Sequence, residues 1–394
     1  MAEAAIEARL SRAPVESRPL EQCLGQTLRE DIYAERDNPP FDRVCMDGIA
    51  IDSRSFERGG RRFVVEAMQA AGAAALTLSD PAHAIEVMTG AIMPRGTDCV
   101  IPLEEYEIAD GIVSLKPEAS ATPYRNVQRR GSDSQPGVAM LKAGIRLGAA
   151  EIAVVASAGR SSIRVSRQPS CVVISTGDEL IEPGEPIAEH QVRRSNVYAV
   201  VAALRAHGLE RVANDHLPDN EERLRQRLAV HLAERQVLVL SGGVSKGKFD
   251  LVPQALKGLR VEEVFHQVAQ RPGMPMWFGV GTEGQLVFGL PGNPVSTLLC
   301  LRRYVIPAIA ASLGSPRAGP EPIALAAPVR FGRPMTYFLP VRVRHDAQGG
   351  AGAVPHPPNG SGDFLALAGT DGFIELPPSQ EPFPEGFVAS LYRW

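Results

Sequence analysis

The strongest constraint on the fold lies between residues 170 and 312, where strand and helix patterns alternate along the chain. The apolar run CVVIST (171–176) is typical of a parallel strand buried on both faces. NVYAVVAALRAHG (196–208) follows with the spacing of an amphipathic helix. Two further apolar runs, QVLVLSGG (236–243) and LVFGLPGNPVS (286–296), end in glycine- or proline-containing loops. This alternation predicts a doubly wound α/β sheet, which binds ligands at the carboxyl ends of its strands.

The segments around this region carry different patterns. NEERLRQRLAVHLAE (220–234) predicts a second helix, with Asp219 directly before it as its N-cap. Residues 1–35 also have helix-like apolar spacing. Between 48 and 135, short apolar runs are separated by Gly, Pro and Asp, which predicts a small, mostly β domain. The tail, 321–394, has short strand patterns and no clear helix, so we predict a second small β domain there.

Composition narrows the class of protein. Glycine (37) and proline (33) make up 70 of 394 residues, about 18% against roughly 12% on average, which indicates many turns and several small domains. The net charge of −4 argues against nucleic-acid binding. Five dispersed cysteines without a C-x-x-C pair indicate reduced thiols and a cytoplasmic location. We find no signal peptide and no run of 18 apolar residues, so we expect no membrane span.

Four loops of the α/β region combine residues suited to an anionic ligand. SGGVSKGKFD (241–250) offers backbone N–H groups and two lysines, as a phosphate cradle does, although it is not a Walker A sequence. STGDEL (175–180) offers a glycine, and we expect a helix to follow it and present free N–H groups. LPGNPVS (290–296) and QRPGMP (270–275) are stiffened by prolines. Each loop alone also fits an ordinary surface turn, but together they favour a ligand crevice.

The acidic side chains allow two interpretations. Asp178 and Glu179 at the mouth of the first strand can hold a metal or a proton, or they can cap a turn and remain solvated. In the small β region, Asp47, Thr89 and Asp133 are further candidates, although a lone carboxylate is usually a surface group. The histidines lack zinc-hydrolase spacing and no G-x-S-x-G elbow occurs, which argues against those hydrolases.

Eight segments, in this order, resemble the MoeA family of molybdopterin molybdenumtransferases, which includes the E domain of gephyrin. They cover residues from about 38 to 363 and read DNPPFDRVCMDGIAI, MTGAIMPRGTDCVIPLEE, NVQRRGSDSQPG, VVISTGDEL with RRSNVYAV, SGGVSKGKFD, RPGMP, GLPGNPVS and NGSGD.

The resemblance implies an elongated, dimeric, multidomain subunit. Its expected domains are a discontinuous linking domain (1–46 and 138–168), a small mostly β inserted domain (47–137), a MogA-like doubly wound β/α domain (169–314) and a C-terminal β domain (315–394). It also implies the reaction: molybdate is inserted into adenylylated molybdopterin, giving molybdenum cofactor and AMP, with Mg²⁺ as the metal. A MogA-type adenylyltransferase is the expected partner, possible further partners are molybdoenzymes, and neither nucleic acid nor a membrane is expected.

The resemblance also assigns site residues by motif. The acidic positions expected to be catalytic are Asp47, Asp133, Glu179 and Asp250, of which Glu179 and Asp250 would hold the metal. Carboxylates are the ligands that Mg²⁺ prefers. The expected substrate-binding residues are Thr89, Asp219 (a looser match), Gly242, Gly243, Ser245, Lys246, Lys248, Arg271, Pro291, Pro294 and Ser361.

The chain departs from the family pattern at basic positions. Gln267, Met274 and Pro340 stand where the family has two lysines and an arginine. Two interpretations follow. In the first, Lys246 and Lys248 replace the lost charge and the chain is an active enzyme. In the second, it is a paralog that carries molybdopterin or docks a molybdoenzyme with little turnover. A third, weaker alternative is an adenylyltransferase, because the β/α region resembles MogA-type proteins.

Overall fold

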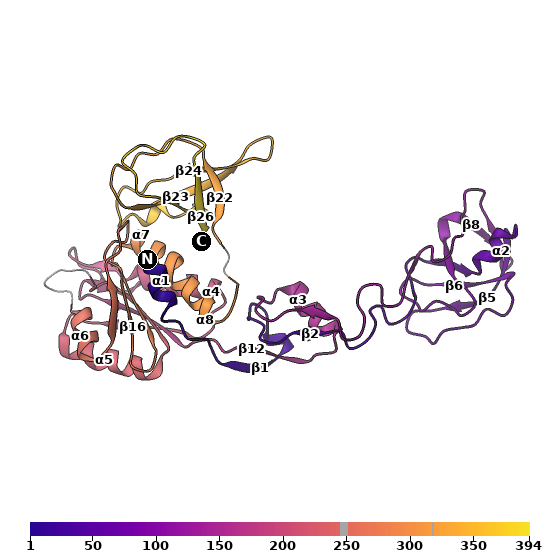
Figure 1. The fold of residues 1–394 in the computed structure, drawn as a ribbon, viewed down its shortest axis with the longest axis horizontal. Coiled ribbons are helices and arrows are strands. Elements are labelled where there is room, and N and C mark those ends of the chain that lie inside the picture. The colour runs from indigo at the N-terminus through magenta and orange to yellow at the C-terminus, as the bar shows by residue number, and fades with distance from the viewer. Residues whose placement is uncertain (245–250, 317–318) are drawn as a thin grey trace. The chain divides into compact units, whose positions relative to one another are not determined.

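The computed structural model describes residues 1–244, 251–316 and 319–394 (Figure 1). They form two compact units. The large unit comprises Met1–Arg29, Gly144–Gly148 and Arg164–Trp394, and the small unit comprises Glu30–Ala143 and Ala149–Ile163.

The large unit contains the predicted doubly wound sheet. Its strand order is β16-β13-β17-β21-β20-β18. These strands are β13 (Cys171–Thr176), β16 (Val212–Leu217), β17 (Val237–Ser241), β18 (Glu262–His266), β20 (Trp277–Val280) and β21 (Leu286–Leu290). The first four strands in the sheet order run parallel, whereas β20 is antiparallel to both of its neighbours. The carboxyl ends of β13, β17 and β21 therefore lie side by side.

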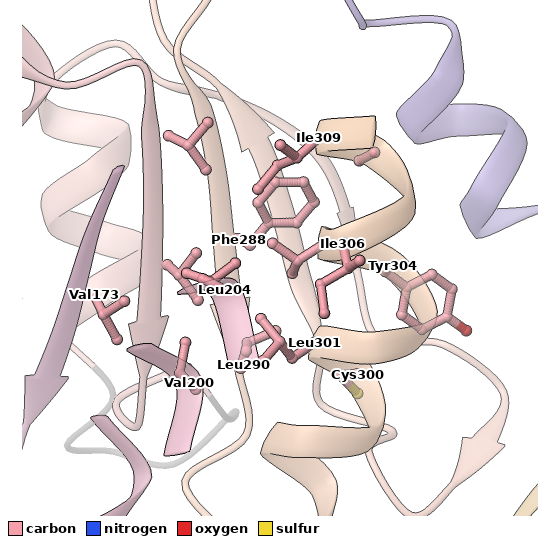
Figure 2. Close-up of a cluster of buried hydrophobic side chains, with 14 of the residues drawn as sticks. Val173, Val200, Leu204, Phe288, Leu290, Cys300, Leu301, Tyr304, Ile306 and Ile309 are labelled. Carbon is pink, nitrogen blue, oxygen red and sulfur yellow. The ribbon is translucent and has the colours of Figure 1, made fainter. Parts of the chain in front are cut away.

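Helices cover both faces of this sheet. They are α4 (Ser195–Ala206), α5 (Glu221–Glu234), α6 (Val252–Gly258), α7 (Pro294–Cys300) and α8 (Ile306–Ser312), with the short α1 (Ala2–Glu7). On one face, Val173 and Phe288 pack with Val200 and Leu204 of α4 and with Ile306 of α8 (Figure 2). On the other face, alternate residues of the same strands pack against α5 and α6. Side chains alternate between the faces of a strand, so fully apolar strands can form two cores.

Among the described residues of the large unit, one helical stretch is long and apolar enough to cross a membrane. It runs from Pro294 to Ser312, with a mean hydropathy of 1.2, and 61% of it is buried inside the protein. A π-helical turn at Leu301–Val305 joins α7 to α8, whose second residue is Pro307. Because proline lacks an N–H, a regular α-helical hydrogen-bond pattern cannot continue through that position. In this helical stretch, Leu301 and Ile309 point into the core in Figure 2, as expected of a buried core helix.

The tail of the large unit is mostly β, as predicted, and its sheet is closed. Its sheet order is β19-β23-β24-β22-β26-β25, and β23 also pairs with β25. The strands are β19 (Gln270–Arg271), β22 (Glu321–Leu325), β23 (Thr336–His345), β24 (Ala351–Pro355), β25 (Gly372–Leu376) and β26 (Val388–Arg393). A short 3₁₀ turn, Phe364–Ala366, lies between β24 and β25. The remaining short strands of this unit are β1 (Val15–Pro19), β14 (Leu180–Ile181) and β15 (Val192–Arg193), with a 3₁₀ turn at Leu20–Gln22. The strand β12 (Ser162–Ser166) begins in the small unit and continues into this one.

The small unit is mostly β. Its main sheet has the order β7-β4-β6-β5-β9-β8 and is antiparallel except between β5 and β6. These strands are β4 (Gly48–Ile51), β5 (Arg62–Gln69), β6 (His83–Val87), β7 (Cys99–Pro102), β8 (Tyr106–Ala109) and β9 (Ile112–Leu115). The other elements are β2 (Ile32–Tyr33), β3 (Arg43–Val44), β10 (Val127–Gln128), β11 (Ala139–Leu141), α2 (Ser53–Glu57), α3 (Ala149–Ser157) and a 3₁₀ turn at Leu103–Glu105.

Three local predictions are wrong. Residues 1–35 are not mainly helical, because Pro14 and Pro19 interrupt the pattern after α1. The N-cap of α5 is Asn220, whose side chain accepts a hydrogen bond from the Arg223 N–H, and not Asp219. The loop after β13 leads into β14 and not into a helix, so no helix N-terminus follows it. The predicted fold class, a doubly wound α/β region with two mostly β regions, is confirmed.

Candidate active site

A cleft of about 790 Å³ opens at the carboxyl ends of β13, β17 and β21 in the large unit. This is the edge at which doubly wound sheets bind their ligands. Six of the residues predicted from the sequence line it: Glu179, Asp219, Gly242, Gly243, Pro291 and Pro294. The crevice that the loops predicted is therefore present, with polar and apolar groups in its wall.

The Gly242–Gly243 turn follows β17 and requires glycine. Both residues have positive φ angles, +96° and +66°. A Cβ on Gly243 would lie 2.8 Å from both Thr176 Oγ1 and Val252 Cγ2. The two glycines thus let the main chain approach the end of β13 closely, which leaves backbone N–H groups near the cleft.

The loop of residues 291–294 (PGNP), which follows β21, is held by hydrogen bonds from both sides. Asn196 at the start of α4 donates from Nδ2 to the Gly292 oxygen at 2.7 Å and to Ser241 Oγ at 2.9 Å. On its other side, Asn293 Nδ2 donates to Ser361 Oγ at 2.8 Å. Ser361 itself is not among the lining residues, although its neighbour Gly362 is. Ser361 therefore contacts the loop that forms the cleft wall.

Two buried polar atoms in the cleft wall have no hydrogen-bond partner among the described residues. They are Thr176 Oγ1 and Asn196 Oδ1. Buried polar atoms are nearly always paired, and each unpaired one costs about 1–3 kcal/mol. Their position in one cleft is typical of a functional site, where local rules of folding are relaxed.

The carboxylates of the cleft are close enough to affect each other. The Asp219 N–H donates to Asp178 Oδ1 at 3.2 Å. Burial raises the pKa of Asp219, and the negative charges of Asp178 and Glu179 raise it further. Burial and like charges disfavour the ionised form of Asp219, and a nearby cation would favour that form. This donor set fits a divalent metal, although no three His, Cys, Asp or Glu residues within 1–244, 251–316 and 319–394 form a complete metal cluster.

Sequence reasoning missed two arginines in the cleft wall. Arg193 and Arg194 both line the cleft. Their position directly before helix α4, in the RRSN segment, was the available signal, but nothing in the local pattern shows that β14 and β15 turn this segment toward the strand ends.

The small unit brings together two other predicted residues. Asp47 precedes β4 and Thr89 follows β6, which is its neighbour in the sheet. Asp47 Oδ1 accepts hydrogen bonds from the Thr89 N–H at 2.6 Å and from Thr89 Oγ1 at 2.8 Å. The N–H and then the hydroxyl of Thr89 lower the pKa of Asp47, so this carboxylate is held ionised.

Asp133, also in the small unit, accepts hydrogen bonds from Gln128 Nε2 at 2.8 and 2.9 Å. Its neighbour Arg130 pairs with Asp37 at 2.5 Å. Asp133 is exposed, so it is available to a ligand.

The positions at which this chain lacks a basic residue of the family pattern do not line the described cleft wall. Arg271 is exposed in β19 and Met274 is 40% exposed, but only Pro275 of their loop lines the cleft. Gln267 is half-buried, and Pro340 is buried within β23. Ser245, Lys246, Lys248 and Asp250 lie outside the described residues, so their predicted roles remain predictions.

These features define a multidomain α/β protein whose cleft combines acidic groups, arginines and glycine-containing loops. Family models match most of the chain. The MoeA N-terminal region (domains I and II) matches residues 1–159, a probable molybdopterin binding domain matches 172–311, and the MoeA C-terminal region (domain IV) matches 322–394. The chain belongs to the MoeA family.

Individual relatives agree with this assignment. A Synechocystis protein named molybdopterin molybdenumtransferase is 39% identical over 371 residues, which cover 94% of this chain and 93% of that protein. A Staphylococcus epidermidis protein of the same name is 29% identical, with 94% and 89% covered. A crystal structure of the MoeA molybdopterin biosynthesis protein from Pyrococcus horikoshii has a TM-score of 0.79 at 30% identity, covering 100% of this chain and 98% of that one.

Proposed function

We propose that this chain is a molybdopterin molybdenumtransferase, which inserts molybdenum from molybdate into adenylylated molybdopterin and releases AMP. The observation that carries the proposal is the cleft at the strand ends, because it places carboxylates beside glycine-containing loops. The 39% identity to a relative of that name supports it.

The chain's own residues would divide the work by charge. Backbone N–H groups around Gly242 and Gly243 bind anionic oxygens, and Pro291 and Pro294 hold their loop rigid. Glu179, with Asp250, would hold Mg²⁺, and Asp219 lies beside Glu179 in the same wall. A bound magnesium ion neutralises phosphate oxygens. In the small unit, Asp47 is kept ionised by Thr89 and, like Asp133, is proposed to be catalytic.

The wider assignment rests on family membership. We propose that the chain works as a cytoplasmic homodimer with the four domains expected from the sequence. We also propose that it receives adenylylated molybdopterin from a MogA-type adenylyltransferase, and that molybdoenzymes accept its product. Light scattering of the purified chain tests the dimer.

The decisive experiment is an assay of AMP release from adenylylated molybdopterin. We expect release that depends on both molybdate and magnesium, and we expect Glu179→Gln to reduce it at least 100-fold. Absence of AMP release at saturating molybdate and magnesium would contradict the enzymatic function. Tight molybdopterin binding under those conditions, unaffected by Glu179→Gln, would favour the carrier alternative.

A further inference from the structure

The described wall of the cleft carries few charged side chains. Two are carboxylates, Glu179 and Asp219, and two are cations, Arg193 and Arg194. The two proposed ligands, a phosphate-linked nucleotide and an oxyanion, are both negatively charged. The state of these two arginines therefore decides how much positive charge the described wall offers.

Arg194 is fully occupied by the protein. Its side chain is 9% exposed and its Nη1 pairs with Glu182 Oε2 at 2.9 Å. Its Nε donates to Ser175 Oγ at 2.6 Å, and its Nη2 donates to the main-chain oxygen of Asp215 at 2.6 Å. This guanidinium is neutralised and fixed across the ends of β13 and β16, so we assign it a structural role.

Arg193 differs from its neighbour in exposure and in hydrogen-bond partners. It is exposed, and its Nη1 donates to the main-chain oxygens of Glu182 at 2.9 Å and Glu185 at 2.7 Å. No carboxylate among the described residues forms an ion pair with it. An arginine has five N–H donors, and two of them, on Nη1, are used here. Its Nε and Nη2 donate no hydrogen bond to a described residue, so this edge offers three donors in the arrangement that matches two oxygens of a phosphate or a similar oxyanion.

The backbone around Arg193 is held in place on both sides. β15 pairs with β14, with Val192 opposite Leu180 and Arg193 opposite Ile181. The Val192 N–H donates to the main-chain oxygen of Glu179 at 2.9 Å, and the Arg194 N–H donates to the main-chain oxygen of Ile181 at 3.0 Å. Arg193 is thus fixed one strand away from the proposed metal-binding carboxylate. A preorganised guanidinium loses little entropy when it binds an anion.

We propose that Arg193 is a substrate-binding residue, whose Nε and Nη2 bind the oxygens of the anion in the cleft. This inference rests on the proposed function insofar as the cleft is the substrate site. The anion is either the nucleotide phosphate or molybdate, which present the same oxygen geometry to a guanidinium.

The test is direct binding to the full-length chain, measured by calorimetry with AMP and with molybdate in separate titrations. The variants are Arg193→Gln, which removes the charge, and Arg193→Lys, which keeps the charge but loses the paired donors. Arg205→Gln is the matched control, because Arg205 is an exposed arginine in the last turn of α4 and does not line the cleft. Thermal melting of each variant checks that the fold is retained.

We expect Arg193→Gln to weaken the binding of at least one anion about tenfold or more, in line with a lost charge-assisted hydrogen bond. Arg193→Lys should recover part of this loss, and Arg205→Gln should bind like the wild type. The titration that is affected identifies the anion that Arg193 contacts. Wild-type binding that Arg193→Gln leaves unchanged for both anions overturns the role of Arg193 alone. A wild-type chain that binds neither anion overturns the proposed substrate site together with this role.

Discussion

Asn196 Nδ2 lies 2.7 Å from the main-chain oxygen of Gly292, so the helix that follows β15 holds the loop that follows β21. The same amide donates to Ser241 Oγ at the end of β17. Two loops of the cleft that are distant in sequence therefore share one side chain. Because the spacing of these loops determines the width of the cleft, Asn196 acts as a positioning residue.

Asn196→Ala should reduce both stability and turnover. It leaves the Gly292 oxygen and Ser241 without this partner, which costs about 1–3 kcal/mol in the free energy of unfolding. The loops should also lose their fixed spacing, so AMP release should fall about tenfold or more beyond the effect of stability. Gln285→Ala is the control, because the Gln285 amide donates to the Leu232 oxygen at 2.7 Å and the residue directly precedes β21, at the other end of the sheet. Equal activity of the two variants at matched fractions of folded protein would contradict the positioning role.

Asp219→Asn should stabilise the chain at pH 7 while reducing activity. Burial raises the pKa of Asp219, and the charges of Asp178 and Glu179 raise it further, so the folded protein binds this proton more tightly than the unfolded chain does. The ionised carboxylate therefore destabilises the fold at neutral pH, and the stability of the wild type rises as the pH falls through the folded pKa. Denaturant unfolding as a function of pH should show the gap between variant and wild type closing in that range. A variant less stable than the wild type at pH 7 would rule this out.

Magnesium should act on the same carboxylates. If Glu179 and Asp219 lie beside the metal, Mg²⁺ raises the melting temperature of the wild type, because a ligand that binds only the folded state stabilises it. The increase should be smaller in Glu179→Gln. Calorimetric scans with and without magnesium measure both shifts, and calcium and sodium serve as comparison ions. An identical magnesium shift in wild type and variant would remove Glu179 from the metal site.

The sequence predicts the strands and the cleft loops well, because both follow from local patterns. A run such as CVVIST has to be buried on two faces, and glycines at 242 and 243 indicate close backbone approach. The roles of Arg193 and Asn196 could not be predicted, because they depend on the pairing of β14 with β15 and on a contact across about a hundred residues of sequence to Gly292. The sequence predicts Asp219 as the N-cap of α5 because it stands directly before the helix pattern, but Asn220 is an equally good cap and local sequence does not distinguish the two.

Thr89 should control the catalytic competence of Asp47. Thr89→Val removes the hydroxyl that donates to Asp47 Oδ1 at 2.8 Å but keeps the backbone N–H, whereas Thr89→Ser keeps both donors. If Asp47 takes part in the reaction, AMP release should fall about tenfold in the valine variant and stay near the wild-type rate in the serine variant. The valine variant should also show the pH dependence of the rate shifted upward, because the pKa of Asp47 is lowered in part by this hydroxyl. Equal rates of AMP release in both variants would show that the Thr89 hydroxyl does not contribute to the reaction.

Asp215 should account for part of the acid sensitivity of the large unit. Its carboxylate accepts a hydrogen bond from His231 Nε2 at 2.7 Å and also pairs with Arg227. Burial alone would raise the pKa of Asp215, but the hydrogen bonds from Arg227 and His231 outweigh burial and lower it. The folded pKa is thus below the unfolded one, so this stabilisation is present at neutral pH and is lost as the pH falls through the folded pKa. Asp215→Asn should lower the free energy of unfolding by about 1.5–3 kcal/mol at pH 7, as expected for hydrogen bonds to a charged group. The difference from the wild type should shrink in acid, whereas Asp346→Asn in an exposed turn should not reproduce this pH dependence. Unfolding curves for the three proteins between neutral pH and about pH 3 measure this gap, and a gap that stayed constant would exclude Asp215 as the titrating group.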